Sequence, residues 1–241
     1  AYRVPNDDTA SFMYAWYSQT SSAAAMTAGT YALMLDKWRQ TFPDSPDPLP
    51  STYKALITHT ARDLNDTTVS SYNPGPDYAS GYGVIQTDNA VDAIGKRMVR
   101  EAEVINGSSA AYMLNLQAGT PQLKVTLAWD DPAALENANA TLINDLDLIV
   151  IEPDGTTRHY PWTLNPNTPA AAAVKTGEDH INNLEQVLVN NPTPGIWQIS
   201  VAGTNVAIGP QQFSIVADQG PVRRPLDMVL ALDISLSLIH I

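Results

Sequence analysis

The sequence predicts a mostly helical first segment followed by an antiparallel β-sandwich, and three observations support this expectation. Apolar residues recur at helical spacing up to about residue 97, whereas later ones occur in short runs separated by turn residues. The charge balance changes at the same point, because residues 1–97 hold 7 basic and 10 acidic residues and residues 98–218 hold 4 and 13. The 241 residues are 44% hydrophobic, which is enough for sizeable cores. We therefore expect one domain over residues 1–97, a second over residues 98–218 and a tail over residues 219–241.

Three helices are expected in the first segment. The first covers residues 21–40, and its many alanines predict a buried helix that packs closely against its neighbours. A proline-rich stretch ends it. Ser51 is the expected cap of the second helix, which runs to about residue 64. A loop rich in Asn, Pro and Gly over residues 65–83 precedes the third helix, over residues 88–96.

The second segment contains seven short runs of β-forming residues with no helical stretch between them. Turn residues separate the runs, and Asp154-Gly155 is the strongest hairpin signal among them. This spacing is typical of an antiparallel sandwich. The predicted strands are residues 99–105, 111–116, 123–129, 146–151, 184–189, 196–201 and 213–217.

Composition excludes several classes of function. A net charge of −12 and a pI of about 4.5 argue against nucleic acid as a partner and against a surface for anionic membranes. No apolar run reaches the ~20 residues that a bilayer requires. The absence of cysteine excludes disulfides, thiol nucleophiles and cysteine-ligated zinc. The apolar residues 228–241 are compatible with a final strand and with a linker to a further module; a third interpretation is that residues 234–241 are not native.

Ser21 is the candidate catalytic residue. A serine at the start of a helix lies beside unpaired N–H groups and the positive end of the helix dipole, which favour a developing oxyanion. Position alone is much better explained by a plain helix cap. The surrounding residues favour catalysis, because they resemble the Gly-Thr-Ser-x-Ala-x-Pro nucleophile motif of subtilisin-like serine peptidases. The matching segment is Gln19-Thr20-Ser21-Ser22-Ala23-Ala24-Ala25-Met26.

The resemblance continues in the same order along the chain. Residues 50–57 are similar to the helix that follows the nucleophile helix in that family, and Gly81-Tyr82-Gly83 is similar to its Gly-x-Gly segment. In the second segment, five stretches resemble the jelly-roll domain that follows the catalytic domain in bacterial subtilases. They are residues 125–132, 142–148, 182–187, 194–197 and 205–214.

The resemblance implies a fold class and an activity. The expected fold is an α/β remnant, the mostly helical C-terminal part of a catalytic domain, followed by an antiparallel jelly-roll β-sandwich. The expected activity is that of a secreted bacterial serine endopeptidase acting on polypeptides, of which this chain is an N-terminally truncated fragment. Ser21 would be the nucleophile, Thr20 would border the bound substrate, and the sandwich would contact the catalytic domain.

Departures from the family pattern limit what the chain can do alone. Gln19 stands where the family has Gly, and Ala25 stands where it has Pro. The family's Asp and His precede its Ser, but the 20 residues before Ser21 contain no His. We therefore expect the isolated chain to be inactive. Two alternatives remain: a pseudopeptidase scaffold, and a sandwich that binds calcium, carbohydrate or a protein surface without catalysis.

Calcium is the expected cofactor, with a structural role. Asp145 and Asp147 are two residues apart, so in a strand both carboxylates point to the same side. Asp131 and Asn144 supply further oxygen atoms close in sequence, and Ca²⁺ takes six to eight such ligands. The resemblance implies calcium as well. An acidic, solvated face without an ion is the alternative.

Overall fold

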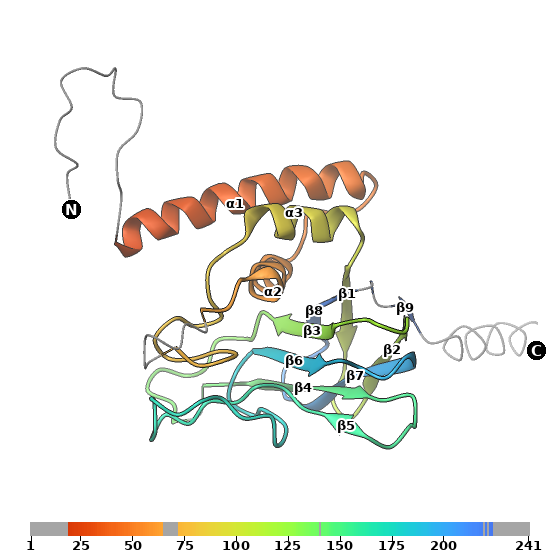
Figure 1. Cartoon of the computed structure of the whole chain (residues 1–241). Coiled ribbons are helices and arrows are strands. Elements are labelled where there is room, and N and C mark those ends of the chain that lie inside the picture. The colour runs from red at the N-terminus through yellow and green to blue at the C-terminus, as the bar shows by residue number, and fades with distance from the viewer. Residues whose placement is uncertain (1–18, 65–71, 140, 219, 221, 224–241) are drawn as a thin grey trace, which may run out of the picture.

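The structure is a computed structural model that describes residues 19–64, 72–139, 141–218, 220 and 222–223. Within these residues, three helices precede nine strands (Figure 1). The helices are α1 (Thr20–Thr41), α2 (Pro50–Thr60) and α3 (Thr87–Gly95). The strands are β1 (Val99–Val104), β2 (Ser109–Leu116), β3 (Gln122–Trp129), β4 (Asn144–Ile151), β5 (Arg158–His159), β6 (Leu184–Asn190), β7 (Gly195–Val206), β8 (Gln211–Ala217) and β9 (Val222–Arg223).

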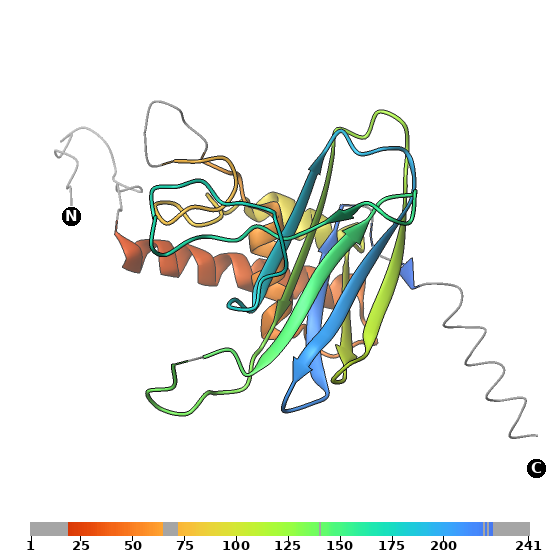
Figure 2. The same ribbon diagram turned by 90° about the horizontal axis from the view of Figure 1, so that it is seen from below.

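The strands form two sheets that face each other (Figure 2). One sheet has the order β1-β8-β3-β6 and the other β5-β4-β7-β2-β9, and every pairing between the described strands is antiparallel. Each of the seven predicted strands overlaps an observed one, and the hairpin at Asp154-Gly155 joins β4 to β5. The core between the sheets contains the largest buried side chains, among them Tyr112, Leu127, Trp129, Trp197 and Phe213.

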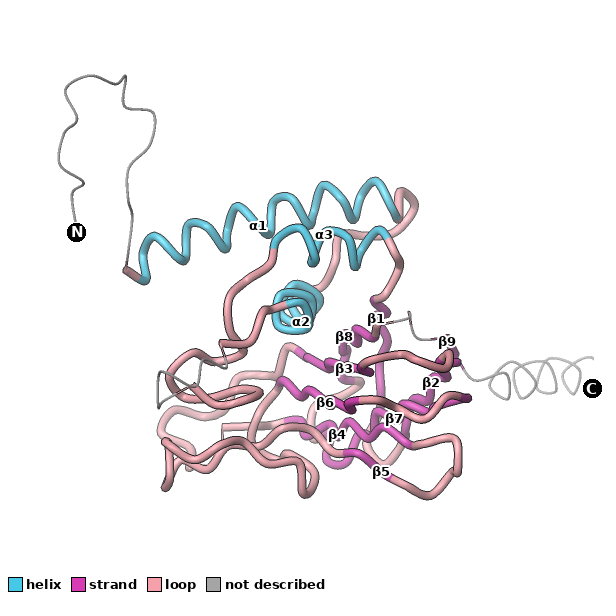
Figure 3. Tube along the Cα trace, in the orientation of Figure 1, coloured by secondary structure: helices cyan, strands magenta, loops and turns pink. Residues whose placement is uncertain are grey.

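The helices cover the outer face of the four-stranded sheet (Figures 1 and 3). α2 lies directly on β3 and β8, and α1 and α3 pack beyond it. This second core joins Met34, Leu56 and Ile94 from the helices to Ala128 and Val216 from the sheet. Successive residues of a strand point to opposite faces. The strands of this sheet therefore contribute side chains both to the core between the sheets and to the core under the helices. This explains why most residues of β3 are buried.

Polar contacts fix the start of α2 on the sandwich. The Ser51 backbone N–H donates to Asp130 Oδ2 at 3.0 Å, and the Leu49 N–H donates to Glu101 Oε1 at 2.8 Å. The Ser51 hydroxyl lies 2.9 Å from Ser214 Oγ on β8. Ser51 is therefore not the cap that the sequence predicted, since α2 begins at Pro50 and carboxylates of the sandwich satisfy its first amides.

The predicted fold class, an α/β remnant followed by a separate jelly-roll β-sandwich, is wrong. The described chain is dominated by two antiparallel sheets, and its three helices share a hydrophobic core with one of them. No parallel sheet accompanies the helices in the described residues. The architecture is that of an α+β layer structure, because the sandwich supplies the surface on which the helices pack. Whether residues 1–97 and 98–218 fold as separate domains stays a prediction.

The prediction of a buried first helix is also wrong for the first half of α1. Ala23, Ala24 and Ala25 are exposed, and the side chain of Met26 is 76% exposed. Only the second half of the helix reaches the core, through residues such as Trp38. None of the described helices is both long and apolar enough to span a membrane. The predicted tail strand at residues 228–241 lies outside the described residues.

Candidate functional site

Ser21 is the second residue of α1, and its side chain is exposed. The helix begins without a side-chain cap, and the N–H groups of Ser22 and Ala23 both donate to the carbonyl oxygen of Gln19 at 3.2 Å. The amides of the first turn point toward the start of a 22-residue helix that has no acidic residue in that turn. A hydroxyl exposed at this position lies in the positive potential of the helix N-terminus, which favours an alkoxide or an oxyanion. Thr20, the first helical residue, is likewise exposed beside it.

The backbone of Gln19 has a conformation that side chains disfavour. Its φ of 86° and ψ of 161° lie in a region that essentially only glycine occupies. This is the position at which the subtilisin-like motif has Gly. The backbone turn before Ser21 is therefore one that suits glycine, although the residue here is glutamine.

The described histidines are engaged away from Ser21. His59 is 3% exposed and lies between Thr126 Oγ1 at 3.1 Å and Asp218 Oδ1 at 3.2 Å. His159 Nε2 lies 2.9 Å from Glu152 Oε1. Both histidines therefore make structural contacts with these partners. His240 lies outside the described residues.

Two of the four predicted metal ligands have hydrogen-bond partners within the chain. The carboxylate of Asp131 accepts from the backbone N–H groups of Ile143 and Asn144, at 2.8 and 2.7 Å. The side-chain amide of Asn144 donates to Ile208 O and to Gln211 Oε1, both at 2.6 Å. Both side chains therefore connect loops to strands, and the structure does not bring them together with the other two candidates as a ligand set.

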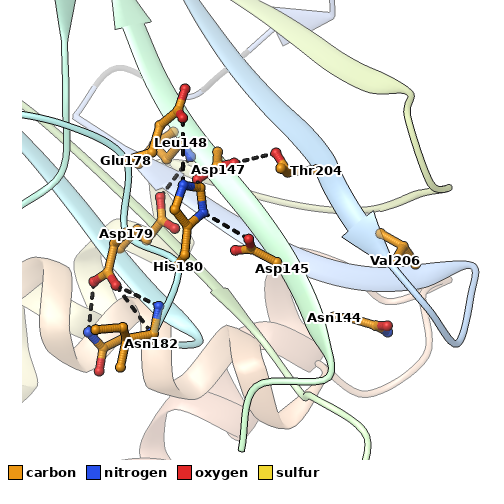
Figure 4. A network of polar contacts seen from close by, with 12 residues as sticks. Asn144, Asp145, Asp147, Leu148, Glu178, Asp179, His180, Asn182, Thr204 and Val206 are labelled. Carbon is orange, nitrogen blue, oxygen red and sulfur yellow. Dashed lines mark hydrogen bonds and ion pairs between the residues drawn. The ribbon is translucent and has the colours of Figure 1, made fainter. Parts of the chain in front are cut away.

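Asp145 and Asp147 do lie together, as their spacing in β4 predicted, and His180 joins them (Figure 4). His180 Nδ1 lies 2.8 Å from Asp145 Oδ2 and 3.5 Å from Asp147 Oδ1. On its other side, Asp147 Oδ2 accepts a hydrogen bond from the Thr204 hydroxyl. We call Asp145, Asp147 and His180 the Asp-Asp-His cluster. A calcium ion held by the four residues named from the sequence stays a prediction.

Burial and like charges control the protonation of this cluster. Burial raises the pKa of both Asp145 and Asp147, and their mutual repulsion adds to the rise at Asp147. For His180, burial lowers the pKa, but the carboxylates of Asp147, Asp145 and Glu178 outweigh it and the net shift is upward. Glu185 is fully buried beside them, and burial raises its pKa well above the usual range.

Two residues of this region are not among the candidates named from the sequence. His180 lies in the loop before β6. Glu185 had a usable signal: it alternates with Val187 and Val189, so it points to the core between the sheets. A carboxylate that is fully buried in a core almost always has a polar or charged partner.

No family model matches the chain. It is similar to the serine protease/ABC transporter B family proteins tagB, tagA and tagD of Dictyostelium discoideum. The identities are 27% over 216 residues, 28% over 183 and 30% over 102, covering 70%, 70% and 41% of this chain. The chain spans only 11%, 10% and 6% of the lengths of these relatives.

One solved structure, a Bacillus licheniformis lipase in its propeptide form, matches 54% of this chain and 22% of its own at 11% identity and a TM-score of 0.31. A score this low does not establish a shared fold. The comparison therefore rests on the three Dictyostelium discoideum proteins. Their names indicate that this chain is related to a serine protease family.

Proposed function

We propose that this chain is the part of a secreted, subtilisin-like serine endopeptidase that carries the nucleophile, Ser21. The observation that carries the proposal is the exposed Ser21 hydroxyl in the first turn of α1, directly after a backbone turn that suits glycine. Similarity to proteins with serine protease names supports it. Secretion is consistent with an acidic chain that has no cysteine.

In the proposed reaction, Ser21 Oγ attacks the carbonyl carbon of the scissile peptide bond while a histidine from another part of the parent protein takes its proton. The backbone N–H of Ser21 donates to the oxyanion of the tetrahedral intermediate. Collapse breaks the C–N bond, the amine leaves with the proton from that histidine, and an ester on Ser21 remains. Water then hydrolyses the ester. Thr20 borders the bound polypeptide.

A fluorophosphonate probe tests the assignment of the nucleophile in the parent protein, which includes the sequence upstream of this chain. The probe phosphonylates only a serine activated by a base, so we expect one labelled site, at Ser21, identified by peptide mass mapping. Ser21→Ala should abolish labelling. Ser22→Ala is the matched control, because it alters the neighbouring hydroxyl in the same turn, and it should keep the label. Equal labelling of the parent and Ser21→Ala would overturn the proposal.

A further inference from the structure

Three potential metal ligands meet at the edge of the sandwich. Asp145 and Asp147 extend from β4, and His180 reaches them from the loop before β6 (Figure 4). One ligand atom from each residue lies within 4.8 Å of the other two. Residues two apart in a strand point to the same side, so the sequence spacing itself brings the two carboxylates together. The histidine comes from 33 residues further along the chain than Asp147.

Buried carboxylate oxygens that lack a hydrogen bond lie in this region. Asp145 Oδ1 and Asp147 Oδ1 are buried and have no hydrogen-bond partner among the described residues. Glu185, fully buried on β6, uses Oε2 to accept from the Leu148 N–H at 2.7 Å, but its Oε1 has no hydrogen-bond partner there either. Buried carboxylate oxygens without partners are costly. A cation bound by the two aspartates would offset that cost at Asp145 and Asp147.

The two nitrogens of His180 have different neighbours. Nδ1 faces the two aspartates, whereas Nε2 lies 3.8 Å from Glu178 Oε2. A neutral imidazole can give its lone pair to a metal through one nitrogen and donate the other N–H to a carboxylate. A ligating histidine usually has such a carboxylate behind it, which fixes the orientation of the ring. Glu178 Oε2, at 3.8 Å from Nε2, is too far to accept a hydrogen bond, so its contact with the ring is electrostatic.

The donor set distinguishes between metals. Ca²⁺ takes six to eight oxygen ligands, and a nitrogen ligand is not among those it prefers. Zn²⁺ binds imidazole nitrogen together with carboxylate oxygen in four-coordinate sites. We propose that Asp145, Asp147 and His180 bind one Zn²⁺ ion. The ion ties β4 of one sheet to the loop that leads into β6 of the other. This proposal does not depend on the role of Ser21.

Zinc binding to the untagged chain tests the proposal. Titration calorimetry with ZnCl₂ should show one site per chain, and ZnCl₂ should raise the melting temperature, because an ion that binds only the folded state stabilises it. His180→Gln should weaken zinc binding by at least the ~10- to 100-fold that follows loss of a partner behind a ligand. Asp145→Asn should weaken it similarly. His159→Gln is the matched control, since His159 also pairs with a carboxylate but lies outside the cluster.

His180 is half exposed, so its replacement should leave the fold intact, and the melting temperature without added metal verifies this. Zinc affinity that is equal in the chain and in His180→Gln would overturn the proposal. Binding of CaCl₂ without binding of ZnCl₂ would overturn it as well, and so would a failure of both ions to bind. Zinc binding that is lost in His180→Gln and retained in His159→Gln supports it.

Discussion

Backbone conformation at single residues limits which side chains this chain tolerates. Gly83 has a φ of 105°, and a Cβ added there would lie 2.2 Å from the carbonyl oxygen of Arg62. No other residue fits that position. Gln19 has a similarly positive φ of 86°, but it carries a side chain. Gly83 is thus the residue that its backbone conformation requires, whereas Gln19 is not.

Replacing Gln19 with glycine should stabilise the chain by about 1 kcal/mol, because a residue held in a sparsely populated backbone region costs roughly 1–3 kcal/mol. Denaturant unfolding measures the change. The control is Asn191→Gly, whose φ of 48° lies in the left-handed region that asparagine accepts, so its effect should be smaller. In the parent protein, Gln19→Gly should also raise proteolytic activity. A loss of stability and of activity would show that Gln19 is not an impediment.

Asp77 is a second residue whose environment makes a prediction. It is 2% exposed, and its carboxylate accepts from the backbone N–H groups of Asn73, Ala79 and Ser80. Burial raises the pKa of Asp77, but these hydrogen bonds and that of the Ser80 hydroxyl outweigh it, so the net shift is downward. The ionised carboxylate therefore contributes stability above the unfolded pKa of about 4, and the contribution is lost as the pH falls through the lower folded value.

Asp77→Asn should accordingly lower the unfolding free energy at pH 7 by about 1–3 kcal/mol, since it removes hydrogen bonds to a charged, buried acceptor. The difference from the unchanged chain should shrink as the pH falls below about 4, where the carboxyl group protonates first in the unfolded chain and, at lower pH, in the folded one. Unfolding curves at several pH values measure this. Asp44→Asn, at an exposed position, is the control and should change little. A difference that is independent of pH would exclude the ionised carboxylate as the cause.

Among the elements, α2 depends most directly on the sandwich. Its first amides are satisfied by Asp130 and Glu101, which lie outside the helix, and its buried face packs on β3 and β8. α1 depends less on its neighbours, since its first half has exposed alanines and only its second half reaches the core. Both helices were predictable from apolar spacing and prolines. Their surroundings were not, because a long-range partner decides which helix face is buried.

Asp130→Ala should lower the unfolding free energy by about 0.5–2 kcal/mol, the usual cost of losing a helix cap. Amide exchange should show faster opening of the first turn of α2, while the strands remain protected. Glu103→Ala serves as the control, because this exposed residue of β1 does not contact the helix start through any hydrogen bond described for it. Unchanged exchange at Ser51 would refute the capping role of Asp130.

Across the whole molecule, sequence reasoning succeeded where the signal was local. Strand positions follow from alternation and turn residues, and the pairing of Asp145 with Asp147 follows from their spacing. His180 lies beside Asp145 and Asp147 because the loop before β6 places it there. No local sequence pattern predicts that position. Asp131, a predicted metal ligand, accepts hydrogen bonds from two backbone amides, and its binding of a metal stays a prediction.

The predicted fold class was wrong for the same reason, because it depends on contacts between segments far apart in the sequence. The helical segment suggested a remnant that stands apart from the sandwich, yet both share one core through residues such as Leu56 and Val216. Packing between segments far apart in the chain sets the architecture. The sandwich therefore has two roles in this molecule: it closes its own core between the sheets, and it presents a surface that organises α2 and, through it, α1 and α3.

Hydrolysis of a peptide substrate by the parent protein and by its Ser21→Ala variant tests the central claim most directly. Loss of the nucleophile should reduce kcat on the order of a million-fold, as removal of such a serine does in enzymes of this mechanism. The circular dichroism spectra of the two proteins should agree, because the exposed Ser21 side chain makes little contribution to packing. A Ser21→Ala protein that retains kcat within about tenfold of the parent would contradict the assignment of Ser21 as the nucleophile.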